Sequence, residues 1–422
     1  MTRGVSILHY TALPVIGGVE SVIGDHTRLF TQAGDAVTLI AGRGGHADAH
    51  AEPNVVVIPE LDSEDPKNRE IARALDEGVV PPEFRTLQAR IEKKLYRPLA
   101  AADVLLVHNV LNFHFNLPLT AALYHLLEQG RTPPLVAWCH DISRYVNASS
   151  GEKQRFGFPW DLLRTFRPEI RYVAVSARRQ RLLAETLDIV PELIRVIPNG
   201  VAPELLLGLG PFGQQVVKEF DLLNADLILL MPVRVTQAKN IEFAMQVTAA
   251  LKATNLAAKL VITGPPDPHG HDADDYFDEL VALRRAMHLE REVIFLYQGT
   301  SDAPGPLTLE PATVAELYRV ADIVFMPSHR EGFGLPVLEG GLAGKAVFAT
   351  EVPAVDQVGA DSVQTIAPDE TPDAVAARMR AWAEQELQPR LQRRVRQDYT
   401  WQAIFEREIA PLIAECTGSA EE

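Results

Sequence analysis

The sequence SHREGFGLPVLE at residues 328–339 follows an apolar run, residues 321–327, that is typical of a buried parallel strand. Two glycines then interrupt the chain, and residues 335–342 can form a helix. Pro336 suits the first turn of that helix, because its missing N–H would have no hydrogen-bond partner there. A strand, a glycine turn and a helix N-terminus offer free backbone N–H groups and a helix dipole to an anion. The sequence therefore predicts a phosphate-sized anion site at this turn.

Two carboxylates flank the predicted anion site. Glu331 lies in the glycine turn, and Glu339 lies about two turns into the helix. This spacing returns the second side chain to nearly the same side of the helix, at about 3.6 residues per turn. Because carboxylates repel a phosphate, we expect the pair to hold sugar and ribose hydroxyls. The alternative is a surface turn with two solvated carboxylates.

The full string, a glutamate, Gly-Phe-Gly-Leu-Pro and a second glutamate after an apolar strand, resembles the E-x7-E motif of retaining GT-B glycosyltransferases, family 4 in particular. The resemblance covers nearly the whole chain and is most specific over residues 233–355. It implies an α/β fold of the GT-B type, with two Rossmann-like, doubly wound domains facing a cleft. It also implies transfer of a sugar from a nucleoside diphosphate sugar to an acceptor hydroxyl, with retention at the anomeric carbon.

Composition agrees with a globular protein of two domains. The chain has 422 residues, of which 47% are hydrophobic and 23% are charged. Its two cysteines, Cys139 and Cys416, exclude a disulfide framework and fit a reducing compartment, so we expect a cytoplasmic protein. We see no signal peptide and no apolar run of the roughly 20 residues that a membrane helix needs. The net charge of −16 argues against nonspecific nucleic-acid binding.

Apolar strands alternate with helical stretches along the chain, which predicts parallel sheets covered by helices. The exception is residues 61–82, an acidic and poorly patterned stretch that we interpret as an excursion over the surface. Residues 5–10 form the expected first strand, and Gly17 and Gly18 follow it before a helix. These glycines resemble the first-loop glycines of family 4, whose backbone approaches the donor diphosphate, although a Gly-Gly pair alone is usually a turn.

Polar residues end several predicted strands of the first half, at the edge where open α/β sheets bind ligands. The strand at 104–107 is followed by His108 and Asn109, and the strand at 135–139 is followed by His140 and Asp141. The resemblance implies that His140 faces the donor sugar on the acceptor side, although a histidine at a strand end is more often structural. Asn109, Asp141 and Asn199 are the remaining acceptor-side candidates, the last in a Pro-Asn-Gly-Val segment that resembles the end of the family's first domain.

The second half carries two cations after its first strand, Arg234 and Lys239. Family members carry Arg and Lys at this spacing ahead of a helix. Fixed cations stabilise a departing diphosphate most in the transition state, where its negative charge grows. We assign catalysis to Arg234 and Lys239 together with Glu331 and His140. We expect Glu331 to contact the sugar and Glu339 to contact the ribose. The remaining donor-binding candidates are Gly264, Gln298, Gly334 and Leu335.

Two further segments have competing interpretations. Residues 149–181 are rich in arginines interleaved with aromatic residues, which indicates either a solvated face over a core or a site for an anionic acceptor. Asp272-Ala273-Asp274, beside His269 and His271, matches the D-x-D metal motif of the other transferase fold, GT-A. Acids at a helix start favour the helix dipole, so we expect no metal there.

These observations lead to one principal hypothesis. The chain is a retaining hexosyltransferase that moves glucose or mannose from a UDP-sugar or GDP-sugar to a small polar or anionic acceptor, without a cofactor or metal. Alternatives are transfer to a lipid or cell-surface glycan precursor and a noncatalytic nucleotide-sugar-binding protein; a dehydrogenase fails because G-x-G-x-x-G is missing. Peripheral membrane contact and a homodimer stay open. The predicted domains are an acceptor-side domain at 1–203, a donor domain at 204–385 and helices crossing back to the first domain at 386–422.

Overall fold

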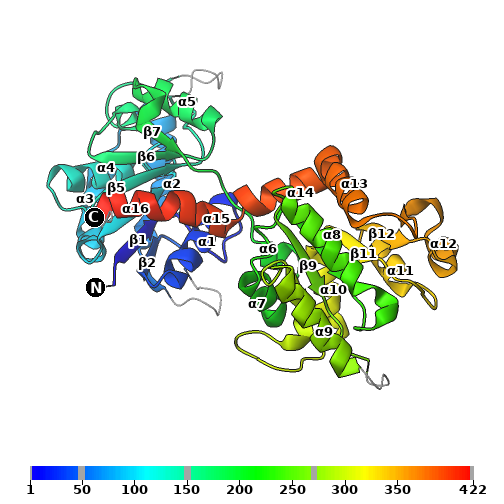
Figure 1. Cartoon of the computed structure of the whole chain (residues 1–422). Coiled ribbons are helices and arrows are strands. Elements are labelled where there is room, and N and C mark those ends of the chain that lie inside the picture. The colour runs from blue at the N-terminus through cyan, green and yellow to red at the C-terminus, as the bar shows by residue number, and fades with distance from the viewer. Residues whose placement is uncertain (1, 46–52, 147–153, 268–272, 419–422) are drawn as a thin grey trace. The chain divides into compact units, whose positions relative to one another are not determined.

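The computed structural model describes residues 2–45, 53–146, 154–267 and 273–418. The chain divides into two compact units (Figure 1). Unit 1 comprises Met1–Gly200 together with Trp401–Glu422, and unit 2 comprises Val201–Thr400.

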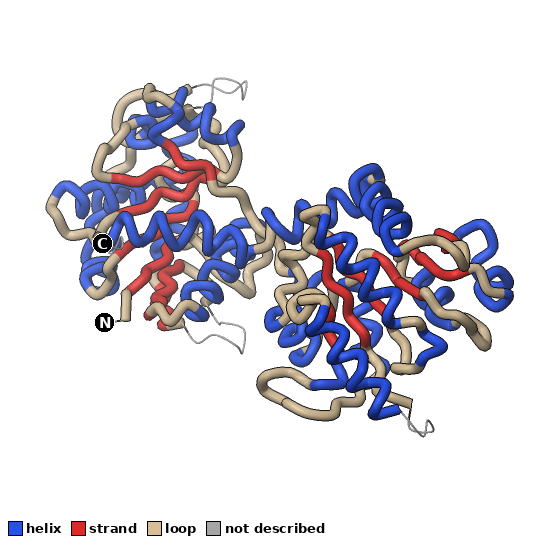
Figure 2. Tube along the Cα trace, viewed as in Figure 1, coloured by secondary structure: helices blue, strands red, loops and turns tan. Residues whose placement is uncertain are grey.

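Unit 1 is built on a parallel sheet of seven strands in the order β3-β2-β1-β4-β5-β6-β7, shown in red in Figure 2. The strands are β1 Gly4–Leu8, β2 Ala36–Ala41, β3 Asn54–Val57, β4 Val104–His108, β5 Leu135–Cys139, β6 Ile170–Ala174 and β7 Ile194–Val196. The helices are α1 Gly18–Gln32, α2 Pro66–Asp76, α3 Glu83–Ala100, α4 Leu117–Glu128, α5 Ala177–Leu187, α15 Trp401–Ile404 and α16 Ala410–Thr417, the last two joined by a π-helical turn at Phe405–Ile409.

The two faces of this sheet pack against different helices, because side chains alternate along each strand. Leu105 and Val107 of β4 belong to the apolar core that includes α3 and α4. His108 lies on the opposite face, where its ring contacts those of Trp138 and His26. Trp401 of the C-terminal helix lies against His26 as well, with 5.3 Å between ring centroids. The C-terminal helix thus completes the core on this face.

Unit 2 contains a parallel sheet of six strands in the order β10-β9-β8-β11-β12-β13. The strands are β8 Leu227–Met231, β9 Ala258–Ile262, β10 Val293–Phe295, β11 Ile323–Met326, β12 Ala346–Thr350 and β13 Gln364–Ile366. The helices are α6 Pro203–Leu206, α7 Pro211–Glu219, α8 Ile241–Ala253, α9 Ala273–Ala286, α10 Pro311–Val320, α11 Leu335–Leu342, α12 Pro353–Gly359, α13 Pro372–Gln385 and α14 Leu387–Asp398. The prediction of two doubly wound α/β domains is confirmed, while their arrangement around a cleft stays a prediction.

The end of unit 2 lies later in the chain than the predicted boundary at 385/386. Arg396 of α14 donates hydrogen bonds to both carboxylate oxygens of Asp322, at 2.6 and 3.0 Å, and the two side chains are 6% and 2% exposed. Asp322 immediately precedes β11 and also accepts a hydrogen bond from the backbone of Ile228 in β8. This buried contact fixes α14 to the sheet of unit 2, and the chain passes to unit 1 only at Trp401.

Residues 61–82, which we interpreted as a poorly patterned excursion over the surface, contain the regular helix α2. Its N-cap is Asp65, whose side chain accepts a hydrogen bond from the backbone N–H of Lys67, and Pro66 is the first helical residue. Three residues of the helix are buried, Asn68, Ile71 and Leu75. A capped, amphipathic helix therefore stands where composition suggested a loop.

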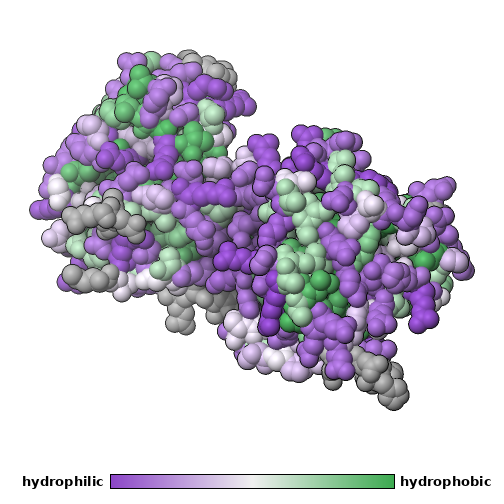
Figure 3. Space-filling model, in the orientation of Figure 1, coloured by the Kyte–Doolittle hydropathy of each residue, from purple (hydrophilic) through white to green (hydrophobic). Residues whose placement is uncertain are grey.

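The surface of the described residues is largely polar. Figure 3 shows hydrophilic residues over most of the face in view, with apolar residues gathered in small separate areas. Among the helices of the described ranges, none combines the length and the apolar character needed to cross a bilayer.

We expect Arg396→Met to lower the free energy of unfolding of unit 2 by about 3–5 kcal/mol, because it leaves the buried carboxylate of Asp322 unpaired. The matched control is Arg393→Met in the same helix. Arg393 lies 4.0 Å from Asp226, and both side chains are more than a quarter exposed, so its loss should cost less than about 1 kcal/mol. Urea unfolding followed by circular dichroism measures both values. Equal effects of the two substitutions would contradict the anchoring role of Arg396.

Candidate functional site

The residues after β8 and β11 meet at the point where the strand order of unit 2 reverses direction. β8 lies between β9 and β11, and chain connections on either side of such a strand run in opposite directions. The loop after β8 carries Arg234 and Lys239, and the loop after β11 carries Glu331. The two loops are tied together by a hydrogen bond from the backbone N–H of His329 to the carbonyl of Ala238, at 2.9 Å. The fold therefore brings these predicted residues to one edge of one sheet.

Lys239 and Glu331 form an ion pair. The Lys239 Nζ donates to both carboxylate oxygens of Glu331, at 2.7 and 2.9 Å. The side chains are 20% and 7% exposed, so the pair is shielded from most of the solvent. From the sequence we expected Lys239 to bind the diphosphate and Glu331 to bind the sugar. We did not expect the two side chains to contact each other. An incoming anion must compete with Glu331 for the lysine.

Arg234 is held much more loosely. Its side chain is 61% exposed and lies 3.9 Å from the carboxylate of Asp267. Gly264, at the end of β9, packs against the same loop: a Cβ there would lie 2.2 Å from the carbonyl oxygen of Val233 and 2.8 Å from the Cα of Arg234. Glycine at 264 is thus explained by close backbone packing beside Arg234, while its predicted contact with a donor stays a prediction.

The glycine turn before α11 has the conformation that the anion-site hypothesis needs. Gly334 is the N-cap residue with φ of +85°, a left-handed conformation that favours glycine. Leu335, the first helical residue, is 58% exposed. Ser328, just after β11, has a buried hydroxyl without a hydrogen-bond partner among the described residues. The first turn of α11 is thus accessible to a ligand.

Glu339 and Gln298 complete the predicted donor residues of unit 2. Glu339 accepts a hydrogen bond from the hydroxyl of Tyr318 in α10, a residue that the sequence analysis missed. Burial, and then this hydrogen bond, raise the pKa of Tyr318. Gln298 lies in the turn after β10, where its carbonyl accepts a hydrogen bond from the N–H of Gly305.

Unit 1 has a corresponding edge between β1 and β4. Gly17 is the extended N-cap residue of α1, and Gly18 is its first helical residue. The carboxylate of Glu20 folds back against this turn, since a Cβ on Gly17 would lie 2.0 Å from Glu20 Oε2. Glu20 also accepts a hydrogen bond from the hydroxyl of Thr11, at 2.5 Å. The carboxylate of Glu20 thus lies beside the glycine whose backbone we expected to approach a diphosphate, and Glu20 was not among the predicted residues.

Two of the predicted acceptor-side residues, Asn109 and Asp141, have partners within the protein. The Asn109 Oδ1 accepts hydrogen bonds from the backbone N–H groups of His140 and Asp141, at 3.1 and 2.9 Å, and from the side chain of Asn112. Asn109 is buried and has φ of +54°. Asp141 pairs with Arg179 at 3.0 Å, while Asn199 is exposed. Asn109 therefore holds the turn after β5, and a direct contact with an acceptor stays a prediction.

Four histidines converge in unit 1, from β4, α1 and the turns after β1 and β5. His9 Nδ1 lies 2.7 Å from the carbonyl oxygen of His108, and His108 Nδ1 lies 3.1 Å from His140 Nε2. The His26 ring lies 5.2 Å from that of His108, and neither of its nitrogens has a hydrogen-bond partner in the described structure. Burial lowers the pKa of all four, to about 3 for His26 and His140. The sequence indicated His140 as a site residue but missed the cluster.

The arginine-rich segment uses several of its charges internally. Arg164 donates to the carbonyls of Tyr145 and Arg155, at 3.3 and 2.8 Å, and its guanidinium lies over the ring of Phe156. Arg167 pairs with Glu128 at 2.5 Å. These contacts favour the interpretation of a packed arginine face, and binding of an anionic acceptor there stays a prediction.

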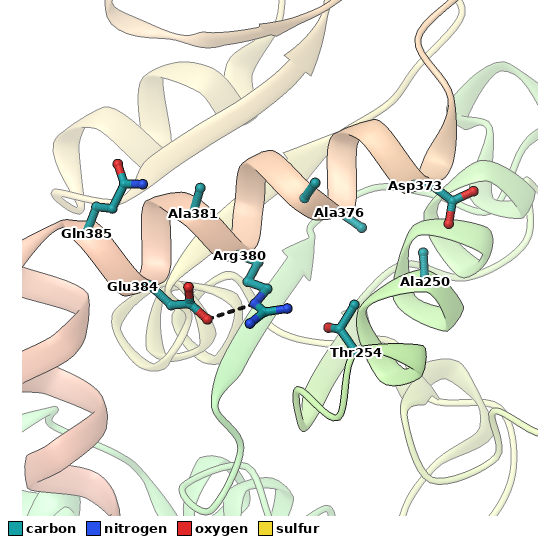
Figure 4. A pocket seen from close by; sticks show the side chains of 9 residues that line it. Ala250, Thr254, Asp373, Ala376, Arg380, Ala381, Glu384 and Gln385 are labelled. Carbon is teal, nitrogen blue, oxygen red and sulfur yellow. Dashed lines mark hydrogen bonds and ion pairs between the residues drawn. The ribbon is translucent and has the colours of Figure 1, made fainter.

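Two pockets of unit 2 help to delimit the site. A groove of about 440 Å³ lies between α8 and α13, lined by alanines and by the Arg380–Glu384 ion pair (Figure 4). None of the predicted residues lines it. A smaller pocket of about 140 Å³ lies beside the Lys239 loop, and Asn240, His329 and Thr350 are among its lining residues. The small pocket is therefore the one that adjoins the candidate site.

A metal centre finds no support within the described ranges, where no group of three or more His, Cys, Asp or Glu side chains is placed to hold an ion. Asp272 lies outside the described residues, and the side chain of Asp274 is not described either. The expectation that no metal is needed stays a prediction.

Comparison with protein families matches both halves of the chain. Residues 16–205 match the model of Glycosyltransferase Family 4, and residues 216–399 match that of Glycosyl transferases group 1. A D-inositol 3-phosphate glycosyltransferase of Geodermatophilus obscurus is 27% identical over 306 residues, which cover 68% of this chain and 62% of the relative. An N-acetyl-alpha-D-glucosaminyl L-malate synthase of Bacillus anthracis is 27% identical over 144 residues, covering 34% of this chain and 32% of the relative. The matched regions thus span less than two thirds of these relatives.

Solved structures with similar chains give weak similarities. Anabaena HepE in complex with UDP and glucose has 17% identity and a TM-score of 0.36, with 98% of this chain and 100% of that chain covered. A sucrose-phosphate synthase from Thermosynechococcus elongatus has 15% identity and a TM-score of 0.38, with 99% and 100% covered.

The buried histidines predict a pH-dependent stability of unit 1. His26 and His140 stay neutral in the native state down to pH of about 3, whereas in the unfolded chain they bind protons below about pH 6.5. The unfolded state therefore binds more protons between these values. The free energy of unfolding should therefore be highest above about pH 6.5. As the pH drops from there toward 3, it should fall by about 1.4 kcal/mol per pH unit for each histidine.

Urea unfolding between pH 5 and 7.5, followed by tryptophan fluorescence, measures this slope, because Trp138, Trp160 and Trp401 all lie in unit 1. His26→Leu should reduce the slope by about 1.4 kcal/mol per pH unit. The control Phe30→Leu, a buried neighbour of His26, should lower stability equally at every pH. If the free energy of unfolding of His26→Leu depended on pH as steeply as that of the wild type, His26 would not be a source of the pH dependence.

Proposed function

Since the chain belongs to the group 1 glycosyltransferases of family 4, we propose that it is a retaining hexosyltransferase. In this proposal it moves glucose or mannose from a UDP-sugar or GDP-sugar to a hydroxyl of a small polar or anionic acceptor. Unit 2 binds the donor, and unit 1 holds the acceptor-side residues. The two cysteines, both free, support function in a reducing compartment such as the cytoplasm.

The observation that supports this proposal best is the Lys239–Glu331 ion pair at the carboxyl edge of the unit 2 sheet. The pair lies next to the glycine turn and the N-terminus of α11, where open backbone N–H groups favour an anion. When a diphosphate binds, Lys239 exchanges the carboxylate of Glu331 for a phosphate oxygen. Glu331 is then free to accept hydrogen bonds from sugar hydroxyls. One ion pair thus supplies both a cation for the leaving group and a carboxylate for the sugar.

The chemical step needs charge stabilisation at the leaving group. The bond between the anomeric carbon and the diphosphate oxygen breaks, and its electron pair leaves with the diphosphate. The acceptor hydroxyl forms the new bond on the same face, and its proton passes to the departing diphosphate. Lys239 and Arg234 interact most strongly with the diphosphate as its negative charge grows, which lowers the barrier. With two cations in this role, no divalent metal or other cofactor is required.

The small anionic acceptor is supported by the names of two relatives. One is named for inositol 3-phosphate and the other for L-malate, and both of these are small anionic molecules. The arginines of residues 154–181 offer charge complementarity in unit 1, although several of them are paired within the protein. The base and the sugar of the donor have no corresponding support, so the experiment must screen them.

The test is a transfer assay with UDP-glucose, GDP-mannose and related donors, against anionic polyols, hydroxy acids and their neutral analogues, with release of nucleoside diphosphate as the readout. We expect one donor to react, faster with an anionic than with a neutral acceptor. Lys239→Ala should lower kcat by about 10²–10³-fold, as expected for losing a preorganised group at a developing charge.

The matched control is Lys252→Ala at the other end of α8. Lys252 is also ion-paired, at 2.9 Å from Glu292, so it carries the same change of charge away from the site. The kcat of Lys252→Ala should equal that of the wild type. The proposal fails if no donor is consumed, or if the two lysine variants have the same activity.

A further inference from the structure

We propose that His108 is a positioning residue for His140: it fixes the tautomer of the His140 ring, so that His140 presents an Nδ1–H donor to a ligand oxygen. The tautomer rests on the geometry of unit 1 alone. Its use in sugar transfer rests on the proposed function. His108 itself does not touch a ligand in this account.

The two rings are held in a defined relation. His108 Nδ1 lies 3.1 Å from His140 Nε2, and the ring planes are stacked at 25° with 5.4 Å between centroids. His108 is fully buried. Its ring stacks on Trp138, to which it is also paired in register across β4 and β5. The ring of His108 is thus fixed by the sheet and by its neighbours.

The backbone of His108 is fixed as well. Its carbonyl oxygen lies 2.7 Å from His9 Nδ1, and because a carbonyl can only accept, His9 must carry a proton on Nδ1. The other nitrogen of His9 faces Glu20, at 4.0 Å from Oε1. His9, with Glu20 beyond it, and His26, whose ring contacts that of His108, are the titratable groups that we find against this side of the pair.

The proton between His108 and His140 can be assigned from burial. One of the two facing nitrogens must donate. His108 Nε2 is buried and has no hydrogen-bond partner among the described residues. A proton on this atom would leave an N–H group buried without an acceptor, which native proteins avoid more strictly than an unused acceptor. The proton of His108 therefore lies on Nδ1 and is donated to His140 Nε2.

The consequence for His140 follows from this assignment. Since its Nε2 accepts, the neutral ring carries its proton on Nδ1. This Nδ1 is not among the buried atoms that lack a partner, and no hydrogen bond occupies it in the described part of the chain. Burial lowers the pKa of His140 to about 3, so the ring is neutral near pH 7. His140 therefore offers a neutral N–H to a sugar or acceptor oxygen and does not act there as a general base.

The direct test is nitrogen NMR of the wild-type protein labelled with ¹⁵N-histidine, with His140→Gln used to assign the signal. We expect His140 to be neutral and protonated on Nδ1 between pH 6 and 8. A proton on Nε2, or an imidazolium in this range, would overturn the proposal. This measurement needs no substrate, so it stands even if the proposed sugar transfer fails.

Substitutions at 108 test the consequence for catalysis. An asparagine side chain can place an N–H close to the position of Nδ1, whereas leucine cannot donate. His108→Leu should lower kcat about tenfold, as expected for a lost hydrogen bond, with little change in KM. His108→Asn should restore most of this loss. Equal loss of kcat in both variants, with folded proteins, would overturn the positioning role.

The matched control is His26→Leu. His26 is equally buried and contacts the ring of His108, but it makes no hydrogen bond to His140. Its substitution should leave kcat and the His140 tautomer unchanged. A His26→Leu variant that shifts the tautomer as His108→Leu does would assign the effect to general packing instead.

Discussion

Both sheets share one topological constraint: the first strand of each unit lies between the second and the fourth. The chain must therefore leave that strand in one direction and later return on its other side. At the carboxyl ends, the loops on either side diverge and leave room for a ligand. In unit 2 these loops contribute Lys239 and Glu331. In unit 1 the same edge holds Glu20, in the first turn of α1, and His108, the last residue of β4. The strand order thus explains why polar side chains far apart in the sequence gather at these edges.

At both edges, several polar side chains pair with one another. Lys239 is paired with Glu331, Glu20 is held by Thr11, and His108 is bonded to His140. A half-buried charge without a partner is costly. A charged side chain that binds a ligand therefore needs a partner within the protein while the ligand is absent. In the proposed function, the ligand replaces such a partner, so that one residue would have different roles in the free and the bound protein.

Local features of the sequence predicted much of the fold. The apolar strands, the glycine turn and the helix Leu335–Leu342 follow from residue patterns within a few positions of one another. The missed helix α2 had a readable signal, since Asp65 and Pro66 form a common helix start, but its polar composition hid it. The burial of Arg396 against Asp322 could not be read locally, because those residues are far apart in the sequence and Arg396 lies in a mostly polar helix.

The candidate site shows the same division. Motif spacing and the resemblance to family 4 indicated Lys239, Glu331 and His140 singly, yet their contacts depend on how separate segments meet. His26 gave no signal because an isolated histidine in an amphipathic helix resembles a solvated residue. Tyr318 was missed because its contact with Glu339 joins two different helices. Sequence patterns therefore supplied candidate site residues, and tertiary packing decided which of them touch.

Titration calorimetry of UDP and GDP with wild type and Glu331→Gln measures whether Lys239 exchanges Glu331 for the diphosphate. Glutamine removes the charge that competes with the diphosphate for Lys239. We expect the nucleotide that binds to do so about tenfold more tightly to the variant, a difference of ~1.4 kcal/mol. The exchange at Lys239 would be contradicted if Glu331→Gln bound the nucleotide as tightly as the wild type or more weakly, or if neither nucleotide bound to either protein.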